Sequence, residues 1–163
     1  MASYAKGPRR HCHRYLTVRM DTPMGSQPQD KESLLHLQVQ SQLDAVSDAL
    51  ERLHDFADAH LSTDESIHRA QLLFNEALTN ALKHGNDFEP EKQITVDVRA
   101  NGHGLMFSVE DEGLGFEPES VENPVTEENL CRTHGRGIHL IEELADEVAF
   151  ECDGRRLCVT ISL

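Results

Sequence analysis

Two alternating strands and a glycine-containing turn lie in the stretch ITVDVRANGHGLMFSVEDEGLGF, residues 94–116, and this stretch decides the fold. Apolar and polar residues alternate over residues 94–98 and again over residues 105–109, as they do in strands that bury one face. A period of two places the apolar side chains of each strand on the same face of a sheet. The stretch therefore predicts two strands with one buried face, followed directly by a polar, glycine-containing turn.

Three further runs of the chain show the same alternation, over residues 35–39, 148–152 and 157–163. The last two runs flank residues 153–156, Asp-Gly-Arg-Arg, which are typical of a hairpin turn. Strands that are connected by hairpins predict a mainly antiparallel sheet, with one face covered and the other facing water or a partner.

Apolar residues at helical spacing predict three helices for the covered face. Ser62 and Glu65 fit a capping box, in which the hydroxyl and the carboxylate satisfy free backbone N–H groups, so a helix should begin there. Gly85 is suited to end that helix in a left-handed cap. The three apolar stripes comprise Leu43, Val46, Leu50, Leu53 and Ala57; Ile67, Ala70, Phe74, Ala77, Leu78 and Ala81; and Ile138, Ile141 and Leu144.

The order of elements predicts a two-layer α/β sandwich, in which three helices cover one face of a mainly antiparallel sheet. Residues 33–163 would form this domain. Residues 1–32 contain scattered prolines and charges, and we expect them to form a flexible extension with one short strand at residues 15–19. Residues 111–135 are polar and too long for a simple connection, which predicts a lid over a site.

The net charge of the chain is −14, which disfavours binding to nucleic acid or to an anionic membrane. The charge is uneven, because residues 1–31 carry +4 and the rest carry −18. A basic segment of this kind could contact a partner, although it is more often a solvated tail. No apolar run approaches the roughly 18 residues of a membrane span, and a signal peptide is not apparent, so we expect a cytoplasmic protein.

The cysteines predict reduced thiols rather than a zinc site. Cys12, Cys131, Cys152 and Cys158 include no CxxC pair. The run His11-Cys12-His13 could bind a metal ion, but ligands so close in sequence rarely complete a tetrahedral site, and a tail is the better interpretation.

Glu76 and Asn80 are the first candidate site residues. They lie four residues apart on the second predicted helix, so their side chains share one face beside the apolar stripe. A carboxylate could act there as a base toward a hydroxyl, and an amide oxygen could bind Mg²⁺. An ordinary polar helix face is the alternative.

Asp111 is the second candidate, because the alternation places it on the same side of its strand as the buried residues. A carboxylate on the inner face needs a donor, which the exocyclic amine of a purine would supply. Gly113 and Gly115 allow a turn and a close approach of the backbone to a ligand. The alternative is a simple turn in which Asp111 accepts nearby N–H groups.

Gly135-Arg136-Gly137 opens the third predicted helix and is the third candidate. The unpaired N–H groups at a helix N-terminus attract phosphate, and glycine lets a polyphosphate come close. Arg132 and Arg136 add positive charge. The alternative interpretation is a flexible hinge of the lid.

The three segments together resemble the N, G1 and G2 boxes of the GHKL ATPases in order and spacing. The segments are FNEALTNALKHG (residues 74–85), DEGLGF (residues 111–116) and GRGIHLI (residues 135–141). Within that superfamily, a chain without added domains is similar to the anti-sigma-factor serine/threonine kinases. The resemblance covers about residues 33–163.

The resemblance implies a Bergerat-type ATP site with Mg²⁺ between the helical layer and the lid. It makes Glu76 the general base, Asn80 the Mg²⁺ ligand and Asp111 the residue that recognises adenine. It assigns the remaining ATP-binding roles to Lys83, Gly113, Gly115, Arg132, Gly135, Arg136 and Gly137.

The resemblance also implies a function, namely transfer of a phosphoryl group to a serine or threonine of a small anti-anti-sigma partner, together with sequestration of a sigma factor. Related kinases pair through the open face and edge of the sheet, so a homodimer is compatible with it. The alternative is a partner-switching module that binds ATP without phosphotransfer. A globular domain that binds no nucleotide is a third, less favoured interpretation.

Overall fold

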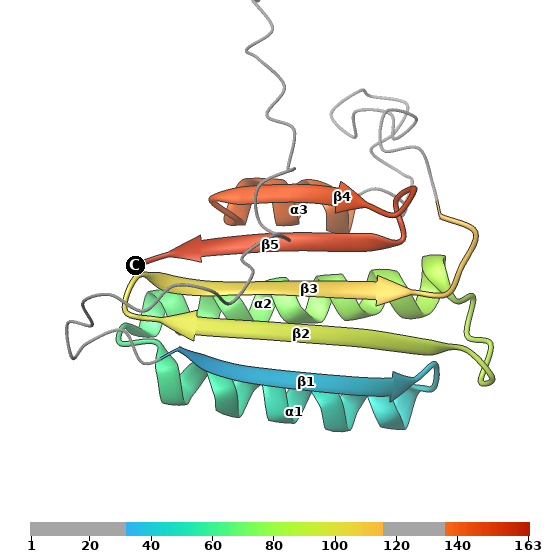
Figure 1. The fold of residues 1–163 in the computed structure, drawn as a ribbon, viewed down its shortest axis with the longest axis horizontal. Coiled ribbons are helices and arrows are strands. Elements are labelled where there is room, and N and C mark those ends of the chain that lie inside the picture. Colours follow the sequence, from blue (N-terminus) through green and yellow to red (C-terminus); the bar gives the residue numbers. More distant parts are fainter. Residues whose placement is uncertain (1–31, 116–135) are drawn as a thin grey trace, which may run out of the picture.

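The computed structural model describes residues 32–115 and 136–163, and these form a two-layer α/β sandwich (Figure 1). In chain order the elements are β1 (Ser33–Gln40), α1 (Leu43–His60), α2 (Asp64–Asn80), a π-helical turn η1 (Ala81–Gly85), β2 (Gln93–Asn101), β3 (Gly104–Asp111), α3 (Arg136–Leu144), β4 (Glu147–Glu151) and β5 (Arg156–Ser162). The predicted order of strands and helices is confirmed.

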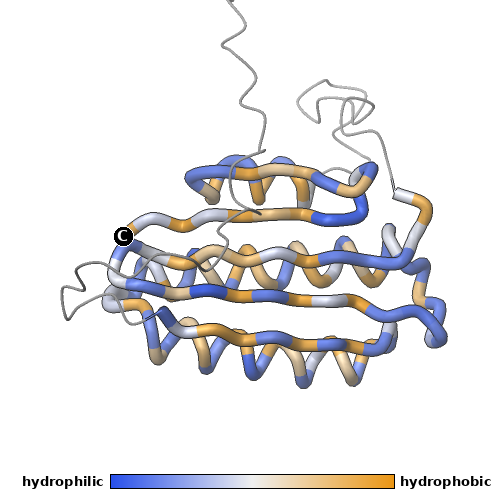
Figure 2. The backbone as a smooth tube through the Cα atoms, in the orientation of Figure 1, coloured by the Kyte–Doolittle hydropathy of each residue, from blue (hydrophilic) through white to orange (hydrophobic). Residues whose placement is uncertain are grey.

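The five strands form one sheet in the order β1-β2-β3-β5-β4, and every neighbouring pair is antiparallel. Figure 1 shows α1, α2 and α3 together behind this sheet. Figure 2 shows hydrophobic and hydrophilic residues alternating along the strands, as a sheet with only one covered face requires. The predicted fold class is therefore confirmed.

The core lies between the sheet and the helices, where α2 packs across the middle strands. Phe74 of α2 is fully buried, and its ring lies 4.7 Å from that of Phe107 on β3, measured between centroids. Burial of a side chain of this size contributes about 2–3 kcal/mol to folding. This buried contact packs α2 against β3, so it also positions α2 relative to the end of that strand.

Two helix predictions are wrong in detail. Thr63, not Ser62, caps α2: its Oγ1 accepts the N–H of Ser66 at 3.2 Å. Both residues carry hydroxyls, and the helix begins one residue later than the predicted box requires. In the stripe of α1, Leu43 at the first helical position is exposed, whereas Ala49 is buried.

The C-terminal end of α2 also differs from the prediction. Gly85 does not adopt a left-handed conformation; the positive φ angles of this region belong to Asp87 and Phe88. Instead α2 continues into η1, in which the N–H of Asn86 donates to the carbonyl of Ala81 at 2.8 Å, five residues earlier. This wide turn shifts Gly85 toward the sheet, with consequences for the site described below.

Two strands end earlier than the alternation predicts. Cys152 lies in the turn after β4, with φ 52°, and Leu163 follows β5 and is exposed. Cys152 and Cys158 form no disulfide within the described part of the chain. The predicted strand at residues 15–19, the His11-Cys12-His13 run and nearly all of the predicted lid lie outside the described residues.

Arg69 of α2 ties the last turn of α3 to the sheet. Its Nε donates to the carbonyl of Leu144, and its Nη2 donates to Asp146 Oδ2 at 2.7 Å. The same carboxylate oxygen accepts the N–H of Ser162 on β5 at 2.7 Å. The N–H of Ser162 and the Arg69 guanidinium lower the pKa of Asp146 against the effect of its partial desolvation. We call Arg69, Leu144, Asp146 and Ser162 the α3 anchor.

Replacement of Arg69 by alanine should destabilise the fold by about 1–2 kcal/mol, because a carbonyl and a carboxylate each lose a donor. Asp146 has a lowered pKa in the folded state, so its contribution is present above its unfolded pKa, about 4, and is lost at lower pH. Urea unfolding at pH 7 and pH 3 should therefore give a smaller effect at pH 3. Arg99→Ala is the control, because Arg99 is an exposed residue 3.8 Å from Glu32. An undiminished effect at pH 3 would contradict the role of Asp146.

Candidate functional site

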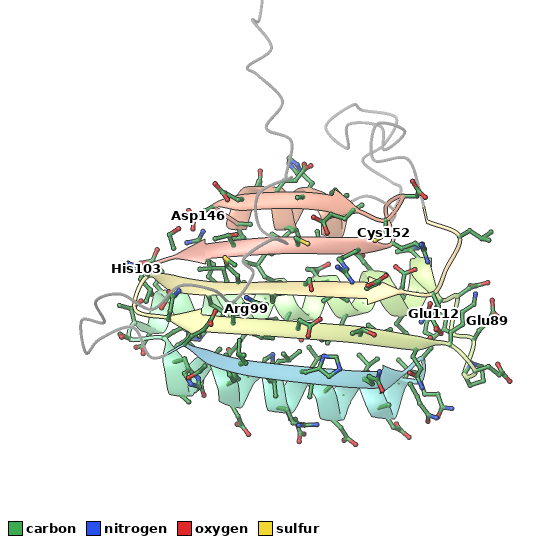
Figure 3. All side chains as sticks on the ribbon, in the orientation of Figure 1. Glu89, Arg99, His103, Glu112, Asp146 and Cys152 are labelled. Atoms are coloured by element: carbon green, nitrogen blue, oxygen red, sulfur yellow. The ribbon has the colours of Figure 1, made fainter. Side chains whose placement is uncertain are left out.

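The candidate residues lie at one end of the sandwich, on α2, on α3 and at the end of β3. Glu76 and Asn80 lie in the last turns of α2, and both side chains are half-buried. Asp111 is the last residue of β3, and η1 runs from Asn80 toward it. Figure 3 shows Glu112 and Cys152 at this end of the sheet, whereas Asp146 and His103 lie at the opposite end.

The N-terminal turn of α3 lies directly against Glu76 and Asn80. A methyl group built on Gly137 would lie 2.7 Å from Glu76 Oε2 and 3.1 Å from Asn80 Oδ1. A side chain at position 137 would therefore occupy the space in front of the carboxylate and the amide. The beginning of α3, where N–H groups are free of helical partners, faces a possible base and a possible metal ligand.

Asp111 lies between two glycines that leave room for its carboxylate. A methyl group on Gly85 would lie 2.2 Å from Asp111 Cγ, and one on Gly113 would lie 2.0 Å from the Gly85 carbonyl oxygen. Asp111 Oδ1 accepts the N–H of Gly113 at 2.8 Å. The turn contact that was the alternative interpretation of Asp111 is therefore present. It involves only Oδ1 of the carboxylate, because the N–H of Gly113 donates to that oxygen.

Burial raises the pKa of the Asp111 carboxyl above its usual value, and the nearby charge of Glu110 acts in the same direction. The N–H of Gly113 and the positive charges of Arg155 and Lys92 oppose this rise. A half-buried carboxylate whose pKa is raised pays a desolvation cost when ionised, which a donor from a ligand would offset. Such perturbed groups are enriched at functional sites.

A model of the histidine kinase-like ATPase domain matches residues 39–163. The chain belongs to this family. The matched part contains α2, β3 and α3, and therefore all the described residues of the site. The match confirms the predicted family, and the resemblance to anti-sigma-factor kinases is confirmed as a distant similarity of about 30% identity.

Several curated proteins are similar to this ATPase domain. The serine-protein kinase RsbW of Listeria innocua is 30% identical over 95 residues, which is 55% of this chain and 60% of that protein. The anti-sigma F factor of Anoxybacillus flavithermus is 30% identical over 89 residues, which is 53% of this chain and 60% of that protein. The anti-sigma F factor of Geobacillus stearothermophilus is 27% identical over 122 residues, which is 73% of this chain and 83% of that protein. The chain thus spans about 60% of the length of the first relatives that it matches.

The structure brings the predicted residues of the ATPase domain into two groups. Glu76, Asn80 and Gly137 form one, and Asp111, Gly113 and Gly115 form the other, with η1 between them. Lys83 lies on η1 and is exposed. Arg132 and Gly135 lie outside the described residues, and Arg136 is described only as the first residue of α3.

Sequence reasoning missed Asn86, which fixes the turn after β3. Asn86 is fully buried; its Nδ2 donates to the carbonyl of Gln93 at 3.0 Å, and its Oδ1 accepts the N–H of Glu112 at 2.8 Å. Glu112 Oε2 in turn accepts the N–H of Gln93 at 2.7 Å. These bonds hold the end of η1, the start of β2 and the turn after β3 together. Asn86 directly follows His84-Gly85 at the end of the first box, but no sequence pattern predicts that a single asparagine will join two strands.

Within residues 32–115 and 136–163, no group of three or more His, Cys, Asp or Glu side chains could hold a metal ion. Mg²⁺ does not need such a group, because it keeps several waters and is often held by one or two protein oxygens together with substrate phosphates. The Asn80 amide beside the glycine-made space at Gly137 fits that requirement. In the same part of the chain, no helix combines the length and apolar character that a bilayer crossing requires.

Proposed function

We propose that this ATPase domain binds ATP with Mg²⁺ and phosphorylates a serine or threonine of a small protein partner. The observation that supports this most strongly is the position of Gly137. It brings the N-terminus of α3 against Glu76 and Asn80, which are a potential base and a potential metal ligand. Phosphoryl transfer depends mostly on positioning and charge neutralisation, so these groups form a sufficient minimal set.

The proposal gives each group of residues a separate task. Asp111 accepts a hydrogen bond from the exocyclic amine of adenine, and the glycines of residues 113 and 115 let the purine approach the backbone. The N–H groups at the start of α3, with Gly135 and Gly137, bind the phosphates, to which Lys83, Arg132 and Arg136 add positive charge. Asn80 would hold Mg²⁺, and the bound ion would neutralise part of the negative charge of the phosphates.

Glu76 acts as the general base in this mechanism. Its carboxylate accepts the proton of the attacking hydroxyl, while that oxygen bonds to the γ-phosphorus and the bond to the β–γ bridging oxygen breaks. ADP and a phosphorylated side chain are the products. Glu76 is half-buried, and its carboxylate lies beside the N-terminal turn of α3, where the proposal places the phosphates.

The names of the relatives support a regulatory partner. Since the matched proteins include a serine-protein kinase and anti-sigma F factors, we include in the proposal a sigma factor that the domain sequesters and an anti-anti-sigma antagonist that it phosphorylates. The uncovered face and edge of the sheet are the candidate surface for a homodimer.

The direct test is incubation of the full chain with γ-labelled ATP, Mg²⁺ and a candidate antagonist encoded beside it. Label on a serine or threonine of the antagonist supports the kinase. Nucleotide binding by calorimetry without any labelled antagonist would instead favour a module that switches partners when ATP binds. Absence of nucleotide binding would reject both.

Replacement of Asp111 by asparagine tests the purine contact. The amide can still accept the N–H of Gly113, but it loses the charge that strengthens a bond from the adenine amine, so ADP affinity should fall about 10- to 100-fold. Stability at pH 7 should not fall, because burial disfavours the charged form of Asp111. Calorimetry with ADP and thermal unfolding measure the two effects. Unchanged ADP affinity would leave Asp111 with only its turn-forming contact.

A further inference from the structure

Asn86 connects the end of η1 to the peptide that follows Asp111. Its backbone N–H donates to the carbonyl of Ala81 at 2.8 Å, which closes the π-helical turn. Its side-chain Oδ1 accepts the N–H of Glu112, also at 2.8 Å. One residue therefore fixes Gly85 through the main chain and the first peptide after Asp111 through the side chain.

The orientation of the Asp111 carboxylate depends on this peptide. Asp111 Oδ1 accepts the N–H of Gly113, the second residue after it, at 2.8 Å. A methyl group on Gly85 would overlap both carboxylate oxygens, so Gly85 and the carboxylate lie in close contact. On its other side Asp111 is held by its own N–H, which donates to the carbonyl of Arg155 at 3.0 Å. The backbone is therefore fixed both before and after the carboxylate, and Asn86 provides the second of these restraints.

The bonds of the Asn86 side chain are made away from water, because the residue is fully buried. Its Nδ2 donates to the carbonyl of Gln93 at 3.0 Å, which orients the amide so that Oδ1 faces the N–H of Glu112. Movement of the turn after β3 would leave a buried polar group without a partner, which is unfavourable. The contact therefore opposes movement of the peptide after Asp111.

The residues after Asn86 adopt a strained backbone. Asp87 and Phe88 have φ angles of 52° and 57°, which are disfavoured for residues with a side chain. Within this turn the N–H of Phe88 donates to the carbonyl of Leu82, and that of Glu89 donates to the carbonyl of Asn86, both at 3.0 Å. Strained conformations persist where the surrounding contacts determine them, and the buried bonds of Asn86 are contacts of this kind.

We propose that Asn86 is a positioning residue that determines purine specificity. It holds the peptide after Asp111 in place before a nucleotide binds, so that the carboxylate accepts an exocyclic amine and rejects a purine with a carbonyl oxygen at that position. The inference rests on the function proposed above and narrows its substrate to adenine nucleotides. An acceptor that cannot turn away is left unpaired by a purine without the amine, and such sites discriminate strongly.

Glu112 forms the other bond across the same junction and provides a matched control. Its Oε2 accepts the N–H of Gln93 at 2.7 Å, but Glu112 is exposed, at the end of the sheet where Figure 3 labels it. Water can replace this bond, and Glu112→Ala keeps the backbone N–H that Asn86 binds. Removal of the Glu112 side chain should therefore leave the carboxylate of Asp111 in place.

The experiment measures the affinities of ADP and inosine diphosphate, with Mg²⁺ present, by calorimetry on the full chain. Inosine diphosphate has a carbonyl oxygen where ADP has the exocyclic amine. The wild type should prefer ADP about 100-fold or more. Asn86→Ala should reduce this preference about 10-fold or more, because displacement of a binding group by about 1 Å has effects of this size.

Two single variants and one double variant separate positioning from stability. Glu112→Ala should keep the wild-type preference within about twofold. So should Thr63→Ala, which loses the cap at the far end of α2 and reports the effect of general destabilisation. In an Asp111→Asn background, Asn86→Ala should change the preference less than about twofold, because both substitutions act on one contact.

Hydrogen exchange of the wild type without nucleotide supplies a measurement that does not depend on the stability of any variant. The N–H of Glu112, bound by the buried Asn86 side chain, should exchange about 100-fold or more slowly than an unprotected amide. NMR measures this rate for the single amide. Fast exchange would show that the turn is not held in advance and would overturn the inference.

The other outcomes distinguish this inference from the proposed function. If Asn86→Ala keeps the full preference for ADP, or if Glu112→Ala loses as much of it, Asn86 has no part in specificity and nucleotide binding stands. A wild type that binds both nucleotides equally would overturn the inference together with the contact between Asp111 and the adenine amine. A wild type that binds neither nucleotide would reject the proposed function and this inference with it.

Discussion

Replacement of Glu76 by glutamine should lower phosphoryl transfer to the protein partner about 10²- to 10⁴-fold, which is the usual contribution of a general base. Glutamine has the same shape and occupies the same place beside Gly137, but its amide cannot take the proton of the attacking hydroxyl. ATP affinity should stay within about twofold, because the purine contact and the Asn80 amide are unchanged. Single-turnover transfer of label, together with calorimetry, separates the two effects.

The control for this variant is Glu65→Gln, which removes a carboxylate from the exposed first turn of the same helix. Its transfer rate should equal that of the wild type. If Glu76→Gln transfers label as fast as Glu65→Gln does, Glu76 is not the base. If neither the wild type nor the variants transfer label although all bind ATP, the partner-switching module becomes the better description.

Replacement of Gly113 by alanine should abolish nucleotide binding, with a loss of ADP affinity of more than about 100-fold, and destabilise the fold by about 2–4 kcal/mol. The added methyl group would lie 2.0 Å from the carbonyl oxygen of Gly85 and 2.8 Å from Asp111 Oδ1. The first of these atoms belongs to the backbone, so the contact cannot be relieved by a side-chain rotation. Either η1 or the turn after β3 must move, and both border Asp111.

Urea unfolding and calorimetry with ADP measure the effects of Gly113→Ala. The matched control is Gly102→Ala, in the exposed turn between β2 and β3 at the other end of the sheet, which should change stability by less than about 0.5 kcal/mol. A Gly113→Ala protein with the stability and ADP affinity of this control would show that residues 85 and 113 are not in contact.

The fold could be predicted from the sequence because each part of it depends on a local period. Alternation over residues 94–98 and 105–109 needs no knowledge of distant residues, and neither does the helical stripe around Phe74. The errors concern single positions. Ser62 and Thr63 both have a hydroxyl that could cap the N-terminus of α2. Which of them does so depends on packing, which the hydrophobic period of the sequence does not predict.

From the spacing of residues alone, without the family resemblance, two site residues could be predicted to lie close together only where one element contains both of them. Glu76 and Asn80 share a helix face because they are four residues apart, so their closeness follows from helix geometry. Their contact with Gly137 depends on how α3 packs on α2, and the role of Gly85 depends on a π-helical turn. Arg155 belongs to no motif, and its position beside the glycine turn follows from the pairing of β5 with β3.

The wide turn at the end of α2 restricts how the length of this chain can vary. Each residue of an α-helix advances about 100° around the axis, so a deletion within η1 that restored regular winding would rotate everything after it by that amount. Gly85 would then turn away from β3 and a side chain would arrive in its place, while Asn86 would lose reach to both strands that it joins. Insertions should therefore be tolerated in the exposed turn between β2 and β3, whereas insertions and deletions should be excluded between Asn80 and Asn86.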